Sequence, residues 1–129
     1  MIKFTIQAKK NPQKKTETKY YAQMTPTTPI SLAEIVKLIE KRSTVSSSDV
    51  KAVLDALQFE IIHALQNGNS VRLGDLGSFH LTLSSKGVAT IEEAKKAGAR
   101  LIKKATVQFV KSAGMGRAFD LDELIFSQQ

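Results

Sequence analysis

Positively charged side chains gather in one short stretch of the second half of the chain. Lys95, Lys96, Arg100, Lys103 and Lys104 fall within ten residues. Ammonium and guanidinium groups at this density can neutralise the phosphates of a polyanion, and such contacts give affinity without reading a base sequence. Solvation of one face of a small helix and the following strand is the alternative explanation. The stretch by itself leaves both explanations open.

The excess of positive charge lies in two segments. The 129 residues include 19 Lys and Arg against 12 Asp and Glu, which gives a net charge of +7. Residues 1–20 carry six Lys and one Glu, and residues 86–111 carry seven Lys or Arg and two Glu. The charge favours a polyanionic partner, either nucleic acid or an anionic membrane surface. The pattern is that of two basic segments attached to a nearly neutral scaffold.

The first 25 residues predict a β-hairpin. Apolar and polar residues alternate in residues 2–7 and again in residues 19–24, which is typical of two half-buried strands. The polar loop between them holds Pro12 and four lysines, Lys9, Lys10, Lys14 and Lys15. For a lone lysine run, simple solubilisation of the loop explains the charge as well as binding does. Residues 26–30 contain Pro26 and Pro29. Because proline lacks the amide donor of a strand ladder, these residues predict a connector.

Two capped helices are predicted in the middle of the chain. Ser31 with Glu34, and Ser46 with Asp49, have the spacing of an N-terminal capping box. Asn67-Gly68 supplies a left-handed stop for the second helix. That helix carries apolar residues on more than one side, which a single thin partner layer cannot cover. We therefore expect one side to pack on a sheet and the other on a second subunit.

A strand, turn and strand follow the helices. Residues 71–73 predict a short strand, and apolar residues at 79, 81 and 83 predict a longer return strand. The turn between them, Gly74–Gly77, lacks the Gly-Lys-Ser/Thr ending of a nucleotide-binding loop, so a hairpin turn explains it best.

The last third of the chain alternates between helix and strand. A capped helix is predicted at 91–97 and a strand at 101–110. The alternation of that strand puts Lys104 on its polar side and Lys103 on the side of Ala105. From residue 112 a partly helical tail is expected, because two glycines weaken an otherwise supported helix.

Several kinds of chemistry are excluded or disfavoured. The chain has no Cys, so it forms no disulfide, thiolate zinc site or cysteine nucleophile. Its two histidines lack ligand spacing, and its paired carboxylates are adjacent on helices and point apart. We expect no metal, no cofactor, no small-molecule substrate and no enzymatic activity. Since no apolar run approaches the length of a membrane span, a soluble cytoplasmic protein without a membrane partner is expected.

The order of these elements resembles the HU and integration host factor family of bacterial architectural DNA-binding proteins. The resemblance rests on the two capped helices, the strings at 68–73 and 74–79, and Val-Gln-Phe at 107–109. The chain is most similar to the HU-like branch found in Bacteroides and its relatives. Members of that branch begin with an extra strand pair, here residues 1–24 with Lys10-Asn11-Pro12.

The resemblance implies an α+β fold of the HU type. Two helices lie under a β-sheet with an arm-like hairpin, the assembly is an intertwined homodimer, and an N-terminal β-hairpin is added. Residues 1–25 would form the hairpin extension, 26–30 the connector and 31–129 the HU-like domain. The implied function is architectural binding of double-stranded DNA in the nucleoid, with little sequence preference; HU-type proteins are an established example of minor-groove binders.

The resemblance also assigns site residues. Gly74 and Gly77 would offer backbone amides to phosphates, and the four loop lysines would form a secondary group. Nothing between residues 84 and 100 matches the Arg-Asn-Pro tip of the family's arm, whose proline wedges between bases, so the arm is expected to be remodelled. The side chains expected to contact DNA are Arg72, Lys86, Lys95, Lys96, Arg100, Lys103, Lys104, Lys111 and Arg117.

Two other functions compete with this one. An HU-fold dimer could use its extra hairpin and altered arm for protein contacts. An RNA-binding module is the second, although Tyr20 and Tyr21 alone resemble residues that stack on bases.

Overall fold

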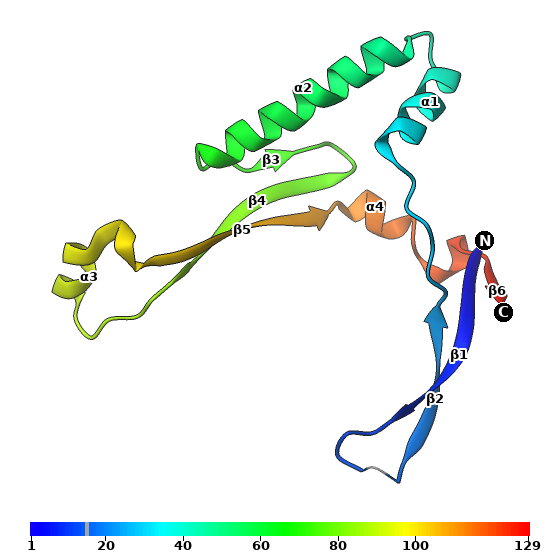
Figure 1. Cartoon of the computed structure of the whole chain (residues 1–129), viewed down its shortest axis with the longest axis horizontal. Helices are drawn as coiled ribbons and strands as arrows, with labels where there is room; N and C mark the ends of the chain where they lie inside the picture. The colour runs from blue at the N-terminus through cyan, green and yellow to red at the C-terminus, as the bar shows by residue number, and fades with distance from the viewer. Residues whose placement is uncertain (15) are drawn as a thin grey trace. The chain divides into compact units, whose positions relative to one another are not determined.

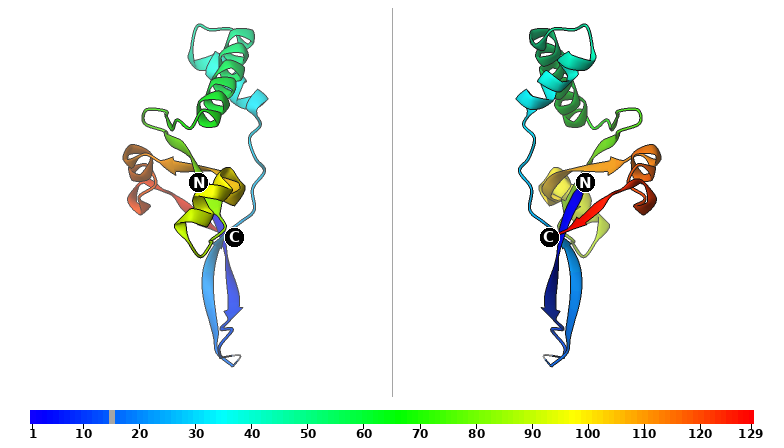
Figure 2. Two further views of the ribbon diagram at one scale, coloured as in Figure 1. Left: turned by 90° about the vertical axis from the view of Figure 1, so that its left-hand side faces the viewer. Right: turned by 90° about the vertical axis from the view of Figure 1, so that its right-hand side faces the viewer.

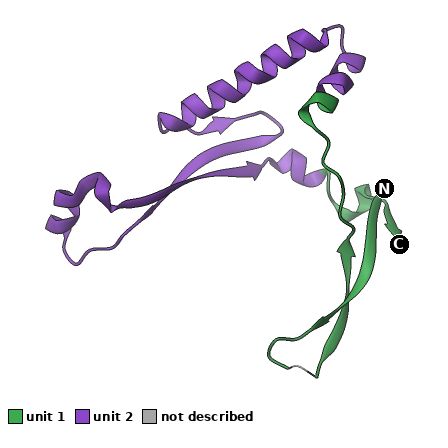
Figure 3. Ribbon diagram, in the orientation of Figure 1, with its two compact units in different colours: residues 1–35, 118–129 green, residues 36–117 purple. Residues whose placement is uncertain are grey.

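The computed structural model describes residues 1–14 and 16–129, and the predicted loop residue Lys15 lies outside the described residues. Its elements are a mixture of helices and strands (Figure 1). Contacts divide the chain into two units, residues 1–35 with 118–129 and residues 36–117 (Figure 3). The expected division into a hairpin extension (1–25), a connector (26–30) and an HU-like domain (31–129) stays a prediction.

The first unit contains a three-stranded sheet in the order β2-β1-β6. Strand β1 (Ile2–Lys10) pairs antiparallel with β2 (Thr18–Met24), which confirms the predicted hairpin. The two strands twist around each other as a long ribbon (Figure 2). Strand β6 (Phe126–Gln128) pairs parallel with β1 on its other edge. Sequence reasoning missed β6, since three residues are too few to show an alternating pattern.

The two faces of this sheet differ in character. Phe4 lies opposite Met24, and Ile2 lies opposite Phe126 across the other ladder. The rings of Phe4 and Phe126 meet edge to face, with centroids 6.4 Å apart. Because side chains alternate across a strand, the opposite face carries the polar residues of β1 and β2, among them Lys9 and Lys19.

The two predicted helices are present. Helix α1 spans Leu32–Arg42 and helix α2 spans Ser47–Gln66. The Glu34 N–H donates to Ser31 Oγ at 3.3 Å, and the Asp49 N–H donates to Ser46 Oγ at 3.3 Å, so both serines cap as predicted. Gly68, with φ +83°, forms the left-handed stop after α2.

The second unit contains a three-stranded antiparallel sheet in the order β3-β4-β5. Its strands are β3 (Val71–Arg72), β4 (Gly77–Ser85) and β5 (Ile102–Lys111). Helix α2 contacts β3 and β4, as expected for its sheet side, although the buried residues of the helix are limited to Val50 and Leu65. Between β4 and β5 lie helix α3 (Ile91–Ala97) and the short 3-10 turn η1 (Gly98–Leu101). The predicted capped helix is confirmed, because the Glu93 N–H donates to Thr90 Oγ1 at 3.2 Å.

One detail of β5 corrects the predicted alternation. Ser84 lies opposite Lys104, but the next pair joins Ser85 to Ile102. Lys103 is therefore the extra residue of a β-bulge, and its side chain need not follow the direction of Ala105. The expectation that Lys103 shares the apolar side of the strand stays a prediction, because the bulge interrupts the alternation on which it was based.

The C-terminal segment is partly helical, as predicted. Helix α4 spans Ala113–Arg117 and a 3-10 turn, η2, spans Leu121–Glu123. Within the part of the chain that the structure describes, none of the helices combines the length and the apolar character that crossing a membrane requires.

A single copy of the chain buries little apolar surface. Among the described residues, the buried apolar side chains are Val36, Val50 and Leu65. The accessible surface is 11043 Å². A compact monomer of this size exposes about 6,800 Å², and two separate bodies of the sizes of the two units expose about 8,000 Å². The accessible surface above these values includes exposed apolar side chains such as Phe59, which is 65% exposed near the middle of α2.

Candidate nucleic-acid interface

The turn between β3 and β4 meets the end of β5 and brings four predicted site residues together. Arg72, Gly74, Gly77 and Lys111 line one shallow hollow of about 150 Å³. Both charged side chains are exposed. We call this hollow the turn site. The remaining residues that line it are Ser78, Val110 and Ser112.

Backbone hydrogen bonds and one serine hold the turn site in shape. The Leu73 N–H donates to the Gly77 carbonyl at 2.8 Å, and the Leu76 N–H donates to the Leu73 carbonyl at 3.0 Å. Ser112 Oγ donates to the carbonyl of Asp75 and accepts from the Met115 N–H, so it ties the turn to the start of α4. Sequence reasoning missed Ser112, and its position as a capping residue just before a short helix was the available signal.

The two glycines of the turn site have different roles. Gly77 is buried and has φ +153°, and a Cβ there would stand 2.7 Å from Phe109 Cζ and closer still to the Val110 carbonyl. Gly74 has φ +53°, is exposed, and has open space where a Cβ would stand. Gly77 therefore lets β4 approach β5, whereas the backbone of Gly74 is open to a ligand.

Six further predicted residues gather at the other end of the β4–β5 ribbon. The Lys86 N–H donates to the Leu101 carbonyl at 2.8 Å and closes the base of the segment that contains α3 and η1 (Figure 1). All six side chains are exposed. We call this group the distal cluster. Its members are Lys86, Lys95, Lys96, Arg100, Lys103 and Lys104.

Arg100 has a structural function within the distal cluster. Its Nε donates to the Ala97 carbonyl at 3.3 Å, and its Nη2 donates to the Lys96 carbonyl at 3.4 Å. These carbonyls end α3, where a cation is favourably placed against the helix dipole. The guanidinium therefore stabilises the end of the helix that presents Lys95 and Lys96.

The turn site and the distal cluster lie at opposite ends of one ribbon. Strand β4 has nine residues, which at a rise of about 3.3 Å separates its ends by roughly 26 Å. Neither β4 nor β5 contains an acidic residue. The two strands, one face of which is apolar, therefore place no carboxylate between the turn site and the distal cluster.

The other predicted residues lie outside these two groups. Arg117 is the exposed last residue of α4. Lys9, Lys10 and Lys14 belong to the first unit, at the end of the β1–β2 hairpin. Within the described part of the chain, His, Asp and Glu side chains form no group of three that could hold a metal ion.

A family model and a solved structure of HU type are both similar to the chain. A family model named HU-HIG, described as an HU domain fused to a winged helix-turn-helix, immunoglobulin or glycine-rich motif, matches residues 1–124. A mutant of HU from Thermotoga maritima has a similar structure, with TM-score 0.53 and 18% identity, over 70% of this chain and 100% of that one. No curated protein sequence matches.

A second solved structure is similar over nearly the whole chain. It comes from Bacteroides vulgatus, is described as a candidate bacterial DNA-binding protein, and has TM-score 0.66 and 13% identity. The similarity covers 98% of this chain but 47% of that one, so the chain spans about half of the length of this relative. At these sequence identities the two structures show the fold alone. Membership of the family is shown by the family model, which matches residues 1–124. The chain belongs to the HU-HIG family and has an HU-type fold of mixed helices and strands with an added N-terminal hairpin.

Proposed function

We propose that the chain is a histone-like architectural protein that binds double-stranded DNA with little sequence preference. The β4–β5 ribbon is the element that contacts DNA. The chain forms a homodimer, in which the ribbons of the two copies bind together. The chain carries out no catalytic step in this role. Binding of this kind would place the protein on the bacterial nucleoid.

The arrangement of charge on the ribbon is the observation that supports this proposal most. Bases stand at both ends of a ribbon free of acidic residues, roughly 26 Å apart. At a rise of about 3.4 Å per base pair, that length matches roughly eight base pairs of duplex. Lysines and arginines in such positions contact phosphates, which fixes the protein on the duplex but carries no sequence information.

The exposed apolar surface supports the homodimer. Side chains in the middle of α2 remain uncovered, since Val53 and Phe59 are each 65% exposed although α2 already contacts the sheet. Apolar faces of this extent need a protein partner. A second copy of the same chain offers an identical face and closes both cores at once.

The altered tip changes the expected effect on DNA shape. Segment 86–101 carries α3 and η1 in place of a proline-bearing tip. Without a wedge between base steps, the ribbon neutralises phosphates on a duplex that bends gently, and easily deformed sequences are bound only slightly better. Arg117 is a further phosphate contact in the same proposal, whereas the lysines of the hairpin loop form a separate group.

A salt series with matched variants tests the proposal. Fluorescence anisotropy with duplexes of unrelated sequence measures the affinity of the wild type and of a variant with Lys103→Gln and Lys104→Gln. The variant should bind all duplexes more weakly, and the slope of log affinity against log salt should fall by about two.

The control removes the same charge elsewhere. Lys37→Gln with Lys41→Gln changes two exposed lysines of α1, which belong to neither basic group. Equal losses in both variants would reduce the effect to net charge and contradict a DNA surface on the ribbon. Retention of wild-type chain on heparin without any binding to duplex would favour the protein-contact function, and preference for single-stranded RNA over duplex would favour the RNA-binding function.

A further inference from the structure

The polar face of the N-terminal hairpin contains an unusual cross-strand pair. Lys9 on β1 lies directly opposite Lys19 on β2. Side chains in directly opposite positions stand about 5 Å apart at Cβ, and like charges there destabilise a hairpin. The pair becomes favourable when an anion binds between the two ammonium groups.

Neighbouring side chains turn this pair into a hollow. Lys9 Nζ lies over the ring of Tyr21, 5.9 Å from its centroid, which holds the ammonium on this face. The residues that line the hollow include three lysines and no carboxylate, and its volume is about 510 Å³. They are Lys9, Lys10, Asn11, Pro12, Lys19, Tyr21 and Ala22.

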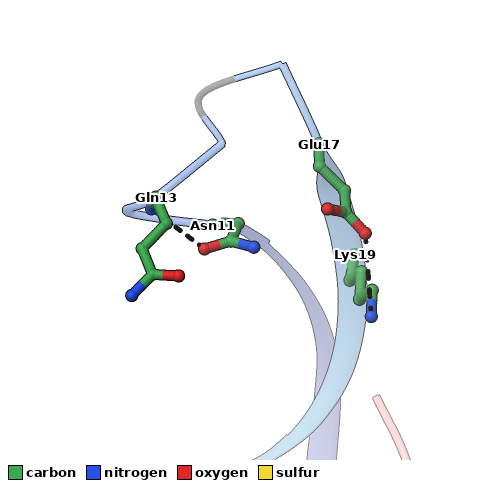
Figure 4. Close-up of polar contacts among 4 residues, drawn as sticks. All are labelled: Asn11, Gln13, Glu17 and Lys19. Carbon is green, nitrogen blue, oxygen red and sulfur yellow. Dashed lines mark hydrogen bonds and ion pairs between the residues drawn. The ribbon is translucent and has the colours of Figure 1, made fainter.

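The described part of the hairpin end is ordered by its own hydrogen bonds. The Gln13 N–H donates to Asn11 Oδ1 at 3.0 Å, as Figure 4 shows. The Asn11 N–H donates to the Glu17 carbonyl at 3.1 Å, and the Lys14 N–H donates to the Asn11 carbonyl at 3.2 Å. These bonds fix Pro12 at the exposed corner beside the hollow and reduce the ordering that a ligand would otherwise have to impose.

One acidic residue stands near the hollow without neutralising it. Glu17 pairs with Lys19 at 3.7 Å (Figure 4). The side chains of Lys19 and Glu17 are 65% and 41% exposed, so solvent screens this ion pair, which is weak and easily exchanged for another anion. Strands β1 and β2 themselves contain no acidic residue.

We propose that this hollow binds the phosphates of a DNA backbone, so that the hairpin is a second duplex-binding element separate from the β4–β5 ribbon. The proposal rests on the proposed function for the class of partner. The ammonium groups of Lys9 and Lys19, on one face of a twisted ribbon, fit successive phosphates of one strand, and the exposed ring of Tyr21 offers an apolar surface to the sugars. The hairpin thereby adds affinity without adding sequence preference.

The test uses the full chain with Lys9→Gln and Lys19→Gln. Duplex affinity should fall roughly tenfold to a hundredfold near 0.1 M salt, and the salt slope should fall by about two. Thermal stability should change little, because the substitutions remove the Lys9–Lys19 repulsion together with the contact of Lys9 with Tyr21 and the weak ion pair of Lys19 with Glu17. The variant with Lys9→Arg and Lys19→Arg should bind as the wild type does, and the Lys37→Gln, Lys41→Gln variant is the matched control for charge.

The outcomes separate this proposal from the proposed function. If the wild type binds duplex and loses affinity only when the ribbon lysines change, the hairpin site is wrong and the ribbon site stands. If the hairpin variant loses affinity whereas the Lys103→Gln, Lys104→Gln variant does not, the hairpin site stands and the ribbon site is wrong. Titration with inorganic tripolyphosphate tests the source of the phosphate. If the Lys9→Gln, Lys19→Gln variant loses binding of tripolyphosphate but keeps the duplex affinity of the wild type, the assignment of the hollow to DNA is overturned.

Discussion

Gly77 lies directly opposite Lys111 in the ladder that joins β4 to β5. The contact is close because the carbonyl of Val110 and the ring of Phe109 occupy the space beside Gly77 where a side chain would stand. Backbone geometry at one glycine thus sets the distance between the turn and the end of β5. Since Arg72 and Lys111 line the same hollow, their spacing depends on that glycine as well.

Gly77→Ala should destabilise the fold. The new Cβ would have to displace Phe109 or shift β5, and φ +153° is unfavourable for alanine, so we expect a loss of about 2–5 kcal/mol in the free energy of unfolding. Urea unfolding measures the loss. Gly74→Ala, with open space and φ +53°, should cost about 1 kcal/mol. Equal effects of the two substitutions would show that the close approach at Gly77 does not matter.

Removing charge from the turn site should weaken DNA binding without unfolding the protein. Arg72→Gln with Lys111→Gln changes two exposed side chains and leaves the hydrogen bonds of the turn intact. The salt slope of duplex affinity should fall by about two. Anisotropy titrations at several salt concentrations measure the slope, and unfolding in urea monitors stability. An unchanged slope in a folded variant would exclude these two side chains from the interface.

Substitution of Arg100 should loosen the end of α3. Arg100→Gln removes the donors to the Ala97 and Lys96 carbonyls, and we expect a local loss of about 1 kcal/mol. Amide hydrogen exchange in residues 94–101 should accelerate roughly fivefold. Arg100→Lys keeps the charge but lacks the planar fork that reaches both carbonyls, so it should restore DNA affinity more fully than protection. Wild-type protection in both variants would mean that Arg100 does not hold the helix end.

Leu57→Asp should unfold the protein rather than yield a folded monomer. Leu57 is 39% exposed in a single copy, so a charge there becomes costly when a second copy covers α2. Because a single copy buries few apolar side chains, loss of the dimer should also unfold the chain. Circular dichroism and light scattering at micromolar concentration distinguish the two results. Gln58→Asp, at the neighbouring exposed position, is the control and should remain a folded dimer. A folded monomeric Leu57→Asp variant would show that one chain is stable alone.

Local patterns in the sequence predicted most of the elements. Caps at Ser31, Ser46 and Thr90 lie within four residues of the amides they bind, so their signals are contained in short windows. The bulge at Lys103 could not be predicted in this way, because it depends on the register between two strands rather than on either strand alone.

Predicting the candidate site needed more than local pattern. The types of Arg72 and Lys111 indicated affinity for phosphate, but only the resemblance to HU-type proteins placed them with Gly74 and Gly77 before the fold was known. The cap that Ser112 gives to Met115 is local and could have been predicted, but its bond to the Asp75 carbonyl joins segments far apart in the chain, and a serine carries no sign of such a partner.

The parallel pairing of β1 with β6 affects how the protein is made. Ile2 leaves the ribosome about 120 residues before Phe126, so the first sheet cannot be completed until β6 has been synthesised. A two-stranded hairpin is marginally stable alone, and β1 and β2 must wait in that state while residues 36–117 emerge and fold. The nascent hairpin is therefore exposed to proteases and chaperones until β6 emerges, and pairing of β1 with β6 ends that exposure.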